Sequence, residues 1–483
     1  MDIKLIGSPK VVMTNTESHH AYFAWPTIAK LQNGRICVGA SGYRVEHICP
    51  FGKGVLAFSD DNGETYGKPI PVFDTVLDDR DVGLTVFSES GLIATSFNNT
   101  LEFQRENMPQ TQECFDYINS VSAEAEADAL GISFRISHDC GETFGKIYKS
   151  PVSSPHGPTV LNDGTILWVG RRLGIHNHIE AHTINTETGE MTLRGEMGLY
   201  KYEDFKDIYF YEPHAIQLSN GKIICHLRAE NKDETLFTLY QTVSLDNGVT
   251  WSKPRQIVRD DSGAPGHLFM HSSGTLISTF SHRSRPYGIW AIFSEDNGET
   301  WSDESVLYYG NDTDDLGYPS TIELPNGDLI TAFYTRDNDY VPALIMQQKW
   351  AFIKPFDNTE FEKHKAEVKE KFGETNAYKE HIKKTKDYSP DKRNNLSNGM
   401  RDIMGEFAEC MKSGKNPDSD EAQALVKKLQ KFISENYYTC TNEVLAGLGQ
   451  MYVLDERFKH SINKHADGTA EFMGKAIEKH LSL

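Results

Sequence analysis

The segment Ser294-Glu-Asp-Asn-Gly-Glu-Thr-Trp301 decides the fold of residues 1–355. The same pattern, Ser-x-Asp-x-Gly-x-Thr followed by an aromatic residue, also begins at Ser59, Ser137 and Ser244. These residue types suit a hairpin turn: the aspartate accepts backbone N–H groups, the glycine adopts positive φ, and the aromatic ring packs inward. Because the turn uses all of this chemistry, we assign these residues to the scaffold and not to a site.

A second repeat is interleaved with the first and consists of an apolar residue, two or three polar residues, a glycine and an apolar strand. Its six glycines are Gly34, Gly91, Gly164, Gly221, Gly274 and Gly327. We expect each of them to supply the positive φ of a tight hairpin. Their spacing is close to the length of a four-stranded propeller blade. One longer interval contains the helix-forming stretch 122–130, which predicts a helical insertion over the second blade.

The composition favours a water-soluble chain of two units. Of the 483 residues, 38% are hydrophobic and 24% are charged, and no apolar run has the length that a membrane helix needs. The N-terminus does not resemble a secretory signal, and the seven cysteines are widely spaced, which argues against a disulfide framework. We therefore expect a cytoplasmic protein with no membrane partner.

The formal net charge of −20 is unevenly distributed along the chain. From residue 357 onward, 21 Lys and Arg nearly balance 22 Asp and Glu, so the excess negative charge belongs to the first unit. Such a field repels polyphosphate, which makes nucleic acid an unfavourable partner for this unit. An anionic ligand there would need a local cluster of arginines.

The Ser-x-Asp-x-Gly-x-Thr pattern resembles the Asp-box, or bacterial neuraminidase repeat, of the sialidase superfamily. The resemblance covers residues 1–355 and implies a six-bladed all-β propeller. It indicates fold strongly and function weakly, because non-catalytic propellers carry Asp-boxes as well. The site has to be predicted from other residues.

By this resemblance, Tyr318 in Gly317-Tyr-Pro319 matches the nucleophile of sialidases, and Glu212 in Tyr211-Glu-Pro213 matches its base. Sialic acid carries a carboxylate on its anomeric carbon, which would repel a carboxylate nucleophile. A tyrosine deprotonated by a glutamate avoids this repulsion. The structural alternative is a buried tyrosine hydrogen-bonded to a core glutamate.

Sialidases bind the substrate carboxylate with three arginines. Arg228, together with Arg283 or Arg285, matches two of them by resemblance, although rim ion pairs would explain the same residues. The third arginine is replaced by Ala24, which cannot bind a carboxylate. Either Arg44 or Arg80 could substitute for it from an adjacent blade.

The remaining candidates match the family less closely. Glu46 and His47 lie where sialidases carry the general acid. Asp79 and Asp81 lie where sialidases carry an aspartate that contacts the N-acyl group, and they suit a turn equally well. His214 is a candidate for contact with a sugar hydroxyl.

No cofactor or metal site is expected from the sequence. Histidines are frequent in the first unit, and His176 and His178 would share one face of a strand. They lack the carboxylate or cysteine spacing that indicates zinc. We therefore interpret the histidines as solvated or hydrogen-bonded.

Residues 356–483 have the pattern of a separate all-helical domain. The segment from Asp418 to Tyr437 combines an N-capping sequence with apolar residues at helical spacing. Stretches such as 437–441 and 445–452 resemble the TipAS antibiotic-recognition domain, which implies a globin-like fold with a cleft for thiopeptide-like ligands. Some members capture ligand through a cysteine, and Cys440 is the matching position here, with a merely buried thiol as the alternative.

Three functional hypotheses follow. The first is a glycoside hydrolase of the exo-sialidase type that cleaves a terminal acidic sugar from an oligosaccharide. The second is a propeller that binds glycans without catalysis, or that catalyses another class of reaction. The third is a ligand sensor in which the helical domain is the active part.

Overall fold

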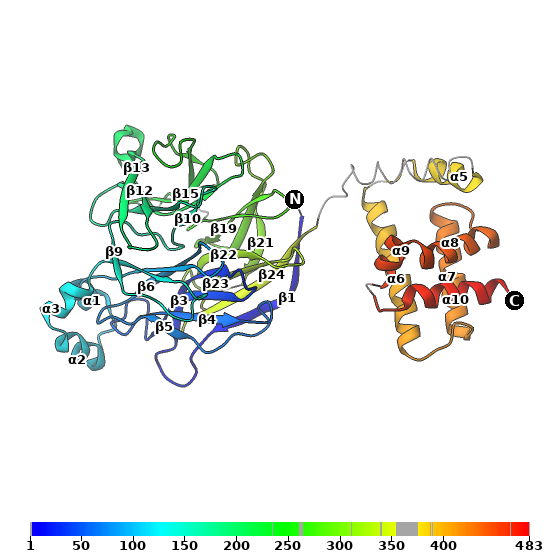
Figure 1. The fold of residues 1–483 in the computed structure, drawn as a ribbon, viewed down its shortest axis with the longest axis horizontal. Coiled ribbons are helices and arrows are strands. Elements are labelled where there is room, and N and C mark those ends of the chain that lie inside the picture. The colour runs from blue at the N-terminus through cyan, green and yellow to red at the C-terminus, as the bar shows by residue number, and fades with distance from the viewer. Residues whose placement is uncertain are drawn as a thin grey trace. The chain divides into compact units, whose positions relative to one another are not determined.

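The computed structural model describes residues 2–233, 235–259, 263, 265–310, 312–338, 341–353, 375–386, 388, 390–463 and 465–482. The chain divides into two compact units, Met1–Pro355 and Phe356–Leu483 (Figure 1). The predicted boundary near Pro355 lies outside the described residues. None of the described helices is both long and apolar enough to cross a membrane.

The first unit consists of six four-stranded antiparallel sheets, the blades of a propeller. Blade one contains β2 (Tyr22–Lys30), β3 (Ile36–Arg44), β4 (Lys53–Ser59) and β5 (Ile70–Phe73). Blade two contains β6 (Arg80–Val86), β7 (Leu92–Phe97), β8 (Ile132–Ser137) and β9 (Tyr148–Ser150). Blade three contains β10 (Thr159–Val160), β11 (Ile166–Arg171), β12 (Ile179–Ile184) and β13 (Met191–Glu196).

Blades four to six complete the ring. Blade four contains β14 (Ile208–Gln217), β15 (Ile223–Asn231), β16 (Phe237–Ser244) and β17 (Arg255–Gln256), preceded by the short 3₁₀ helices η1 (Leu199–Lys201) and η2 (Glu203–Phe205). Blade five contains β18 (His267–Met270), β19 (Leu276–His282), β20 (Gly288–Ser294) and β21 (Ser305–Tyr309). Blade six contains β22 (Gly317–Glu323), β23 (Leu329–Thr335), β24 (Leu344–Ile353) and β1 (Asp2–Met13). The predicted six-bladed propeller is confirmed.

The ring is closed by strands from the two ends of the unit. β1 is the outermost strand of blade six and pairs antiparallel with β24, from Asp2 opposite Ile353 to Met13 opposite Ile345. Blades one and six share a core in which residues of β2, β22 and β23 pack together, including Phe23, Ile322 and Ala332. This closure places the first and the last strand of the propeller sequence side by side in blade six.

The Asp-boxes form the turns between the third and fourth strands of blades one, two, four and five. In blade four, Ser244 Oγ accepts a hydrogen bond from Gly248 N at 2.8 Å and donates one to Asp246 Oδ1 at 2.8 Å. Asp246 also accepts from Thr250 N at 2.9 Å. Hydrogen bonds from the hydroxyl and backbone of Thr250 lower the pKa of Asp246 to about 2. The carboxylate is therefore fully used within its own turn.

The second repeat forms the turns between the first and second strands. Five of its glycines have positive φ as predicted: Gly34, Gly164, Gly221, Gly274 and Gly327. Gly91 does not, so the prediction was wrong at this position. A Cβ atom on Gly91 would lie 2.4 Å from Ser88 Oγ and 2.5 Å from the Phe87 ring. Glycine is needed there for space and not for backbone conformation.

The inner strands of four blades share a bulge near their first residues. Trp25, Asp81, Glu212 and Tyr318 all have left-handed backbone, with φ between 46° and 56°. The pairing with the second strand shifts register at each of these residues. A bulge of this kind redirects a side chain away from the regular alternation of a strand. Equivalent residues of four blades are therefore presented at one rim.

The insertion in blade two is helical, as predicted. It consists of α1 (Leu101–Asn107), α2 (Gln112–Ser120) and α3 (Ala123–Ala129), between β7 and β8. Threonine or serine caps each helix, as Thr111 does by accepting a hydrogen bond from Cys114 N at 3.3 Å. The three helices lie together outside the sheets (Figure 1).

The second unit is all-helical, as predicted. Its described helices are α5 (Asn376–Thr385), α6 (Pro390–Lys412), α7 (Asp420–Asn436), α8 (Asn442–Leu454), α9 (Glu456–Asn463) and α10 (Thr469–Leu481). Ser419 caps α7 by accepting a hydrogen bond from Ala422 N at 3.3 Å. Buried apolar residues of α6, α7, α8 and α10 form its core, among them Phe407, Leu429 and Met473.

Candidate active site

The bulges of blades four and six bring Glu212 and Tyr318 into contact. The Tyr318 hydroxyl donates a hydrogen bond to Glu212 Oε1, and the other carboxylate oxygen accepts one from Arg228 Nη1 at 3.0 Å. Tyr318 is 5% exposed. Burial raises the pKa of Tyr318 well above its ordinary value, and the charges of Glu212 and Asp81 raise it further. The resting tyrosine is therefore a phenol whose only described acceptor is a carboxylate.

Two arginines adjoin this pair. Burial opposes the charge of Arg228, but the carboxylates of Glu212 and Glu230 outweigh it and raise the pKa of Arg228. Arg228 bonds Glu230 at 2.8 Å. Arg283 lies with its guanidinium carbon 5.7 Å from the Tyr318 ring centroid and donates to the Tyr334 hydroxyl at 3.2 Å. The structure thus brings Arg228 and Arg283 together with the Tyr318–Glu212 pair.

Arg285 and His214 lie elsewhere. Arg285 is exposed, and its guanidinium carbon lies 5.1 Å from the Tyr287 ring centroid. His214 is buried; its Nδ1 accepts a hydrogen bond from Leu268 N at 2.9 Å, and its ring stacks on His267 at 4.5 Å. Burial lowers the pKa of His214 to about 4. It belongs to the core of the ring, and no interaction joins it to the Tyr318–Glu212 pair among the described residues.

Blade one offers an aromatic platform near the place of the missing arginine. Ala24 is fully buried, and the neighbouring Trp25 carries the bulge. The guanidinium carbon of Arg80 lies 4.0 Å from the Trp25 ring centroid. Burial raises the pKa of Tyr334, while Arg283 and Arg80 both oppose that rise, which places both cations near one hydroxyl. Arg80 is therefore the cation that accompanies Arg283.

Arg44 shares two acceptors with Arg80, which donates to Asp78 Oδ2 at 3.3 Å and to the backbone carbonyl of His47 at 2.8 Å, but Arg44 is held by both oxygens of Asp78. Its side chain is fully buried and pairs with Asp78, at 2.5 Å and 2.8 Å to the two carboxylate oxygens. It also donates to the backbone carbonyl of His47 at 2.7 Å. These bonds tie β3 to the segment before β6, so the contacts of Arg44 are those of a buried structural ion pair.

Asp79 and Asp81, at the start of blade two, have different surroundings. Asp79 accepts hydrogen bonds from Thr75 N at 2.7 Å and from Thr75 Oγ1 at 2.9 Å, as a turn residue does. Asp81 carries the bulge and is close enough to Glu212 and Tyr318 for their charges to interact. Burial raises the pKa of Asp81 to about 7, and the charge of Glu212 contributes to this rise.

Glu46 and His47 lie at the border of the site. Both Glu46 carboxylate oxygens accept hydrogen bonds from Arg336, at 2.9 and 3.1 Å. His47 Nδ1 lies 3.2 Å from the Tyr22 hydroxyl. The two residues line a cavity of about 550 Å³, whose opposite side is formed by residues 107–109 of the helical insertion.

Asp315 is a central residue of the site that was not predicted. It accepts hydrogen bonds from the hydroxyls of Tyr22 and Tyr334, at 3.0 and 3.1 Å, and from Arg336 at 3.2 Å. Burial opposes its ionisation, but hydrogen bonds from His47 and Tyr22 lower the pKa of Asp315 to about 2. A pattern could have found Arg336, because an arginine lies at the end of the second strand, or within three residues of it, in five blades. These residues are Arg44, Arg171, Arg228, Arg283 and Arg336.

The helical unit has a cavity of its own. It measures about 770 Å³ and is lined by residues of α6, the start of α7 and His465, including Cys410 and Leu425. Cys440 is only 5% exposed and packs in the helical core. Burial raises the pKa of Cys440 to about 11, which disfavours the thiolate that covalent capture needs. Capture through Cys440 stays a prediction.

Two family models match the chain. Residues 115–330 match the BNR repeat-like domain, and residues 364–480 match the TipAS antibiotic-recognition domain. The predicted combination of a BNR propeller with a TipAS domain is confirmed. The HTH-type transcriptional activator TipA of Streptomyces coelicolor is 31% identical over 134 residues, which are 28% of this chain and 52% of TipA. The chain thus spans about half the length of this curated relative.

Solved structures resemble the propeller. A protein of unknown function from Dyadobacter fermentans has a TM-score of 0.59 and 17% identity, covering 72% of this chain and 99% of that one. The NanB sialidase of Streptococcus pneumoniae has a TM-score of 0.50 and 15% identity, covering 71% of this chain and 70% of that one. At these identities the likeness concerns the fold alone.

The pKa of Asp81 predicts a pH dependence of stability. An aspartate in the unfolded chain ionises above about pH 4, whereas Asp81 in the fold keeps its proton up to about pH 7. Between these values the folded chain holds more protons, so the free energy of unfolding falls as the pH rises. We expect Asp81→Asn to reduce this fall between pH 4.5 and pH 8 by roughly 1–4 kcal/mol. Urea titrations of the propeller transition, followed by tryptophan fluorescence, measure it.

The control is Asp207→Asn, a substitution of the same kind at an exposed residue. This variant should have the same pH profile of stability as wild type. Parallel stability curves for wild type and Asp81→Asn would contradict the assigned pKa.

Proposed function

We propose that the propeller is a glycoside hydrolase that removes a terminal acidic sugar, in the manner of an exo-sialidase. The hydrogen bond between Tyr318 and Glu212 carries this proposal. A buried phenol paired with a carboxylate is the arrangement that a tyrosine nucleophile requires, because the base must remove the proton as the oxygen attacks. The low-identity likeness to sialidase propellers agrees with the proposal without testing it.

In the proposed mechanism, Tyr318 Oη attacks the anomeric carbon while Glu212 takes its proton. The bond from that carbon to the leaving oxygen breaks, and the sugar is held on Tyr318 as a covalent intermediate. Arg228 stabilises Glu212 from the far side of the carboxylate and fixes its orientation. Water then releases the sugar, and Tyr318 recovers its proton from Glu212.

The leaving oxygen needs a proton, and we assign this role to Asp81. A carboxyl group whose pKa is about 7 is partly protonated at neutral pH and can give a proton and take it back. Glu46 and His47, at the edge of the 550 Å³ cavity, are then left to contact the leaving group. The 107–109 segment of the insertion would form the opposite wall of that subsite.

Arg283 and Arg80 are the proposed clamp for the substrate carboxylate. Both act on Tyr334, and Trp25 supports Arg80 in the place where the sialidase pattern has an arginine in blade one. Arg44 is fully buried against Asp78 and contributes no clamp in this proposal, whereas the contact of Arg80 with Asp78 is longer, at 3.3 Å. Two cations in place of three favour a substrate that is acidic but differs from the usual sialosides in how its carboxylate is held.

Glycan binding without catalysis is the second candidate. It is favoured by the pairing of Arg228 with both Glu212 and Glu230, which leaves that guanidinium little capacity for a ligand. Hydrolysis separates the two candidates, because a binding module would retain the sugar intact.

For the helical unit, we propose binding of a thiopeptide-like ligand in the 770 Å³ cavity beside α6 and α7. The match of residues 364–480 to an antibiotic-recognition domain supports this proposal, and the cavity supplies a place for the ligand. The helical unit would then act as the sensor of the chain. No nucleic-acid partner is proposed for it.

Tyr318→Phe tests the nucleophile. We expect the variant to lose at least about 1,000-fold in kcat/KM, because the phenyl ring keeps the packing but has no oxygen to attack. Fluorogenic glycosides of sialic acids, hexuronic acids and neutral arabinose provide the assay. Tyr309→Phe, at a residue that is 70% exposed, is the control and should retain full activity. An active Tyr318→Phe enzyme, or an inactive wild type on every acidic sugar, would refute the proposal.

Arg283→Gln tests the carboxylate clamp. We expect KM to rise by about 10–100-fold for glycosides that carry a carboxylate and to stay unchanged for their carboxamide analogues, since the lost interaction is charge-assisted. Arg285→Gln changes the same residue type two positions away on the exposed loop and should have no effect. An equal rise in KM for both substrate classes would point to a general packing defect.

Leu425→Arg tests the helical cavity. A charged side chain at this lining residue should abolish binding of a thiopeptide antibiotic to the full chain, as followed by calorimetry. Leu454→Arg is the matched control, because Leu454 is 76% exposed on α8. Unchanged binding in Leu425→Arg would place the ligand elsewhere.

A further inference from the structure

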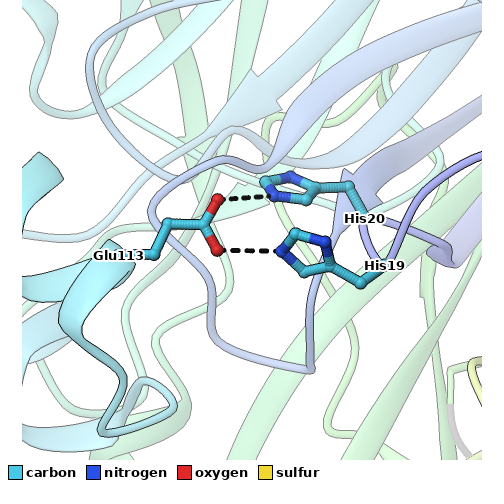
Figure 2. Close-up of side chains that lie close together, drawn as sticks. All are labelled: His19, His20 and Glu113. Carbon is cyan, nitrogen blue, oxygen red and sulfur yellow. Dashed lines mark hydrogen bonds and ion pairs between the residues drawn. The ribbon is translucent and has the colours of Figure 1, made fainter.

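Two adjacent histidines and a distant glutamate meet outside the candidate active site. His19 and His20 lie in the loop between β1 and β2, and Glu113 lies in the first turn of α2. His19 Nε2 lies 2.8 Å from Glu113 Oε2, and His20 Nε2 lies 3.0 Å from Glu113 Oε1. Figure 2 shows both rings directed at the same carboxylate. One ligand atom from each residue lies within 4.8 Å of the other two.

The surroundings of His20 favour a cation in this cluster. Its Nδ1 faces the backbone carbonyl of Tyr43 at 3.2 Å, and its Nε2 faces the Glu113 carboxylate. A neutral imidazole has only one N–H group, so it cannot satisfy two acceptors. If Nδ1 donates to the carbonyl, the lone pair of Nε2 points at an anion. Either a second proton or a metal ion resolves this conflict.

A metal ion fits the arrangement for a further reason. Histidine ligands of metals usually donate their other ring N–H to a carbonyl or carboxylate, which fixes the tautomer. His20 has such a partner in Tyr43. Two ligand atoms each about 2.1 Å from a tetrahedral zinc ion lie about 3.4 Å apart, so each of the two His–Glu distances needs to lengthen by only about half an ångström.

Both sides of the cluster are held by the scaffold. The carbonyl of His20 accepts a hydrogen bond from Asn15 Nδ2 at 3.0 Å, and its ring lies 4.7 Å from that of Phe51. On the other side, Cys114, the residue after Glu113, is fully buried and packs with Met108 and Ile118 beneath α2. The three ligands therefore come from two segments whose positions the packing already sets.

We propose that His19, His20 and Glu113 form a binding site for a divalent transition metal, with zinc as the fitting ion. Two imidazoles and one carboxylate are a zinc ligand set, and the remaining coordination position would be taken by water. The water can enter because the side chains of His19 and Glu113 are 63% and 47% exposed. The site is independent of the proposed hydrolase activity.

The position of the site gives the metal a structural role. It would join the β1–β2 loop to the helical insertion, 94 residues further along the chain. The insertion also forms one wall of the 550 Å³ cavity that Glu46 and His47 line. Metal binding would therefore fix that wall against blade one.

The test uses zinc and the full-length chain. We expect purified, chelator-treated protein to take up zinc in calorimetry, and Glu113→Gln and His20→Ala each to bind one equivalent fewer than wild type. We also expect zinc to raise the midpoint of thermal unfolding of the propeller in wild type and not in these variants. Cobalt absorption in the visible range reports the histidine and carboxylate ligands directly, and these bands should disappear in both variants.

Glu102→Gln is the matched control, because Glu102 occupies the same place in the first turn of α1 as Glu113 does in α2. It should bind as much zinc as wild type. Equal zinc stoichiometry in wild type and Glu113→Gln would overturn the proposal. A second result would also overturn it: Glu113→Gln is less stable than wild type without metal, and zinc changes the stability of neither protein. That result would assign the cluster to a protonated His20 paired with Glu113.

Discussion

The left-handed backbone at the start of four inner strands is the constraint on which the candidate site depends. Trp25, Asp81, Glu212 and Tyr318 adopt it although each carries a side chain, a conformation that costs about 1–2 kcal/mol per residue. Hairpin pairing on both sides of each bulge holds the residue in place. Strands with regular alternation would direct these side chains into the space between blades. The bulges direct them to one rim, which carries an indole, two carboxyl groups and a phenol.

The repeat that builds the blades also supplies the arginines. Each second strand runs antiparallel to an inner strand, so its last residues lie beside the bulge of its partner. Tyr211, the residue before Glu212, pairs with Arg228 in this way. Arg44, Arg283 and Arg336 occupy the equivalent place in other blades, and each finds a different acidic or phenolic partner. One backbone pattern has thus given a buried ion pair with Asp78 in one blade and a cation beside the Tyr318 ring in another.

The blades could be predicted from sequence because their signal is repeated along the chain, and the Tyr318–Glu212 pairing could be predicted because the family resemblance implied it. Asp315 could not, since its partners Tyr22, His47 and Arg336 lie in blades one and six and meet only when the ring closes. The His19–Glu113 contact could not be predicted from the sequence either, because it joins a loop to an insertion far away in the chain. His214 was misplaced because a histidine next to a predicted base suggests a ligand contact, whereas burial and stacking on His267 decide its position. Burial is a property of the whole ring and not of a short motif.

The pairing of β1 with β24 has a consequence during protein synthesis. β1 is made before the other described strands of the propeller, but its hydrogen-bonding partner is made more than 330 residues later. At about 5–20 residues per second, the first strand waits for many seconds with an unpaired edge and with no blade six to join. The propeller cannot close before β24 emerges, and the helical unit is still being translated at that moment. The nascent ring therefore passes through an open, five-bladed stage in which a holdase chaperone or a second nascent chain could occupy the edge reserved for β1.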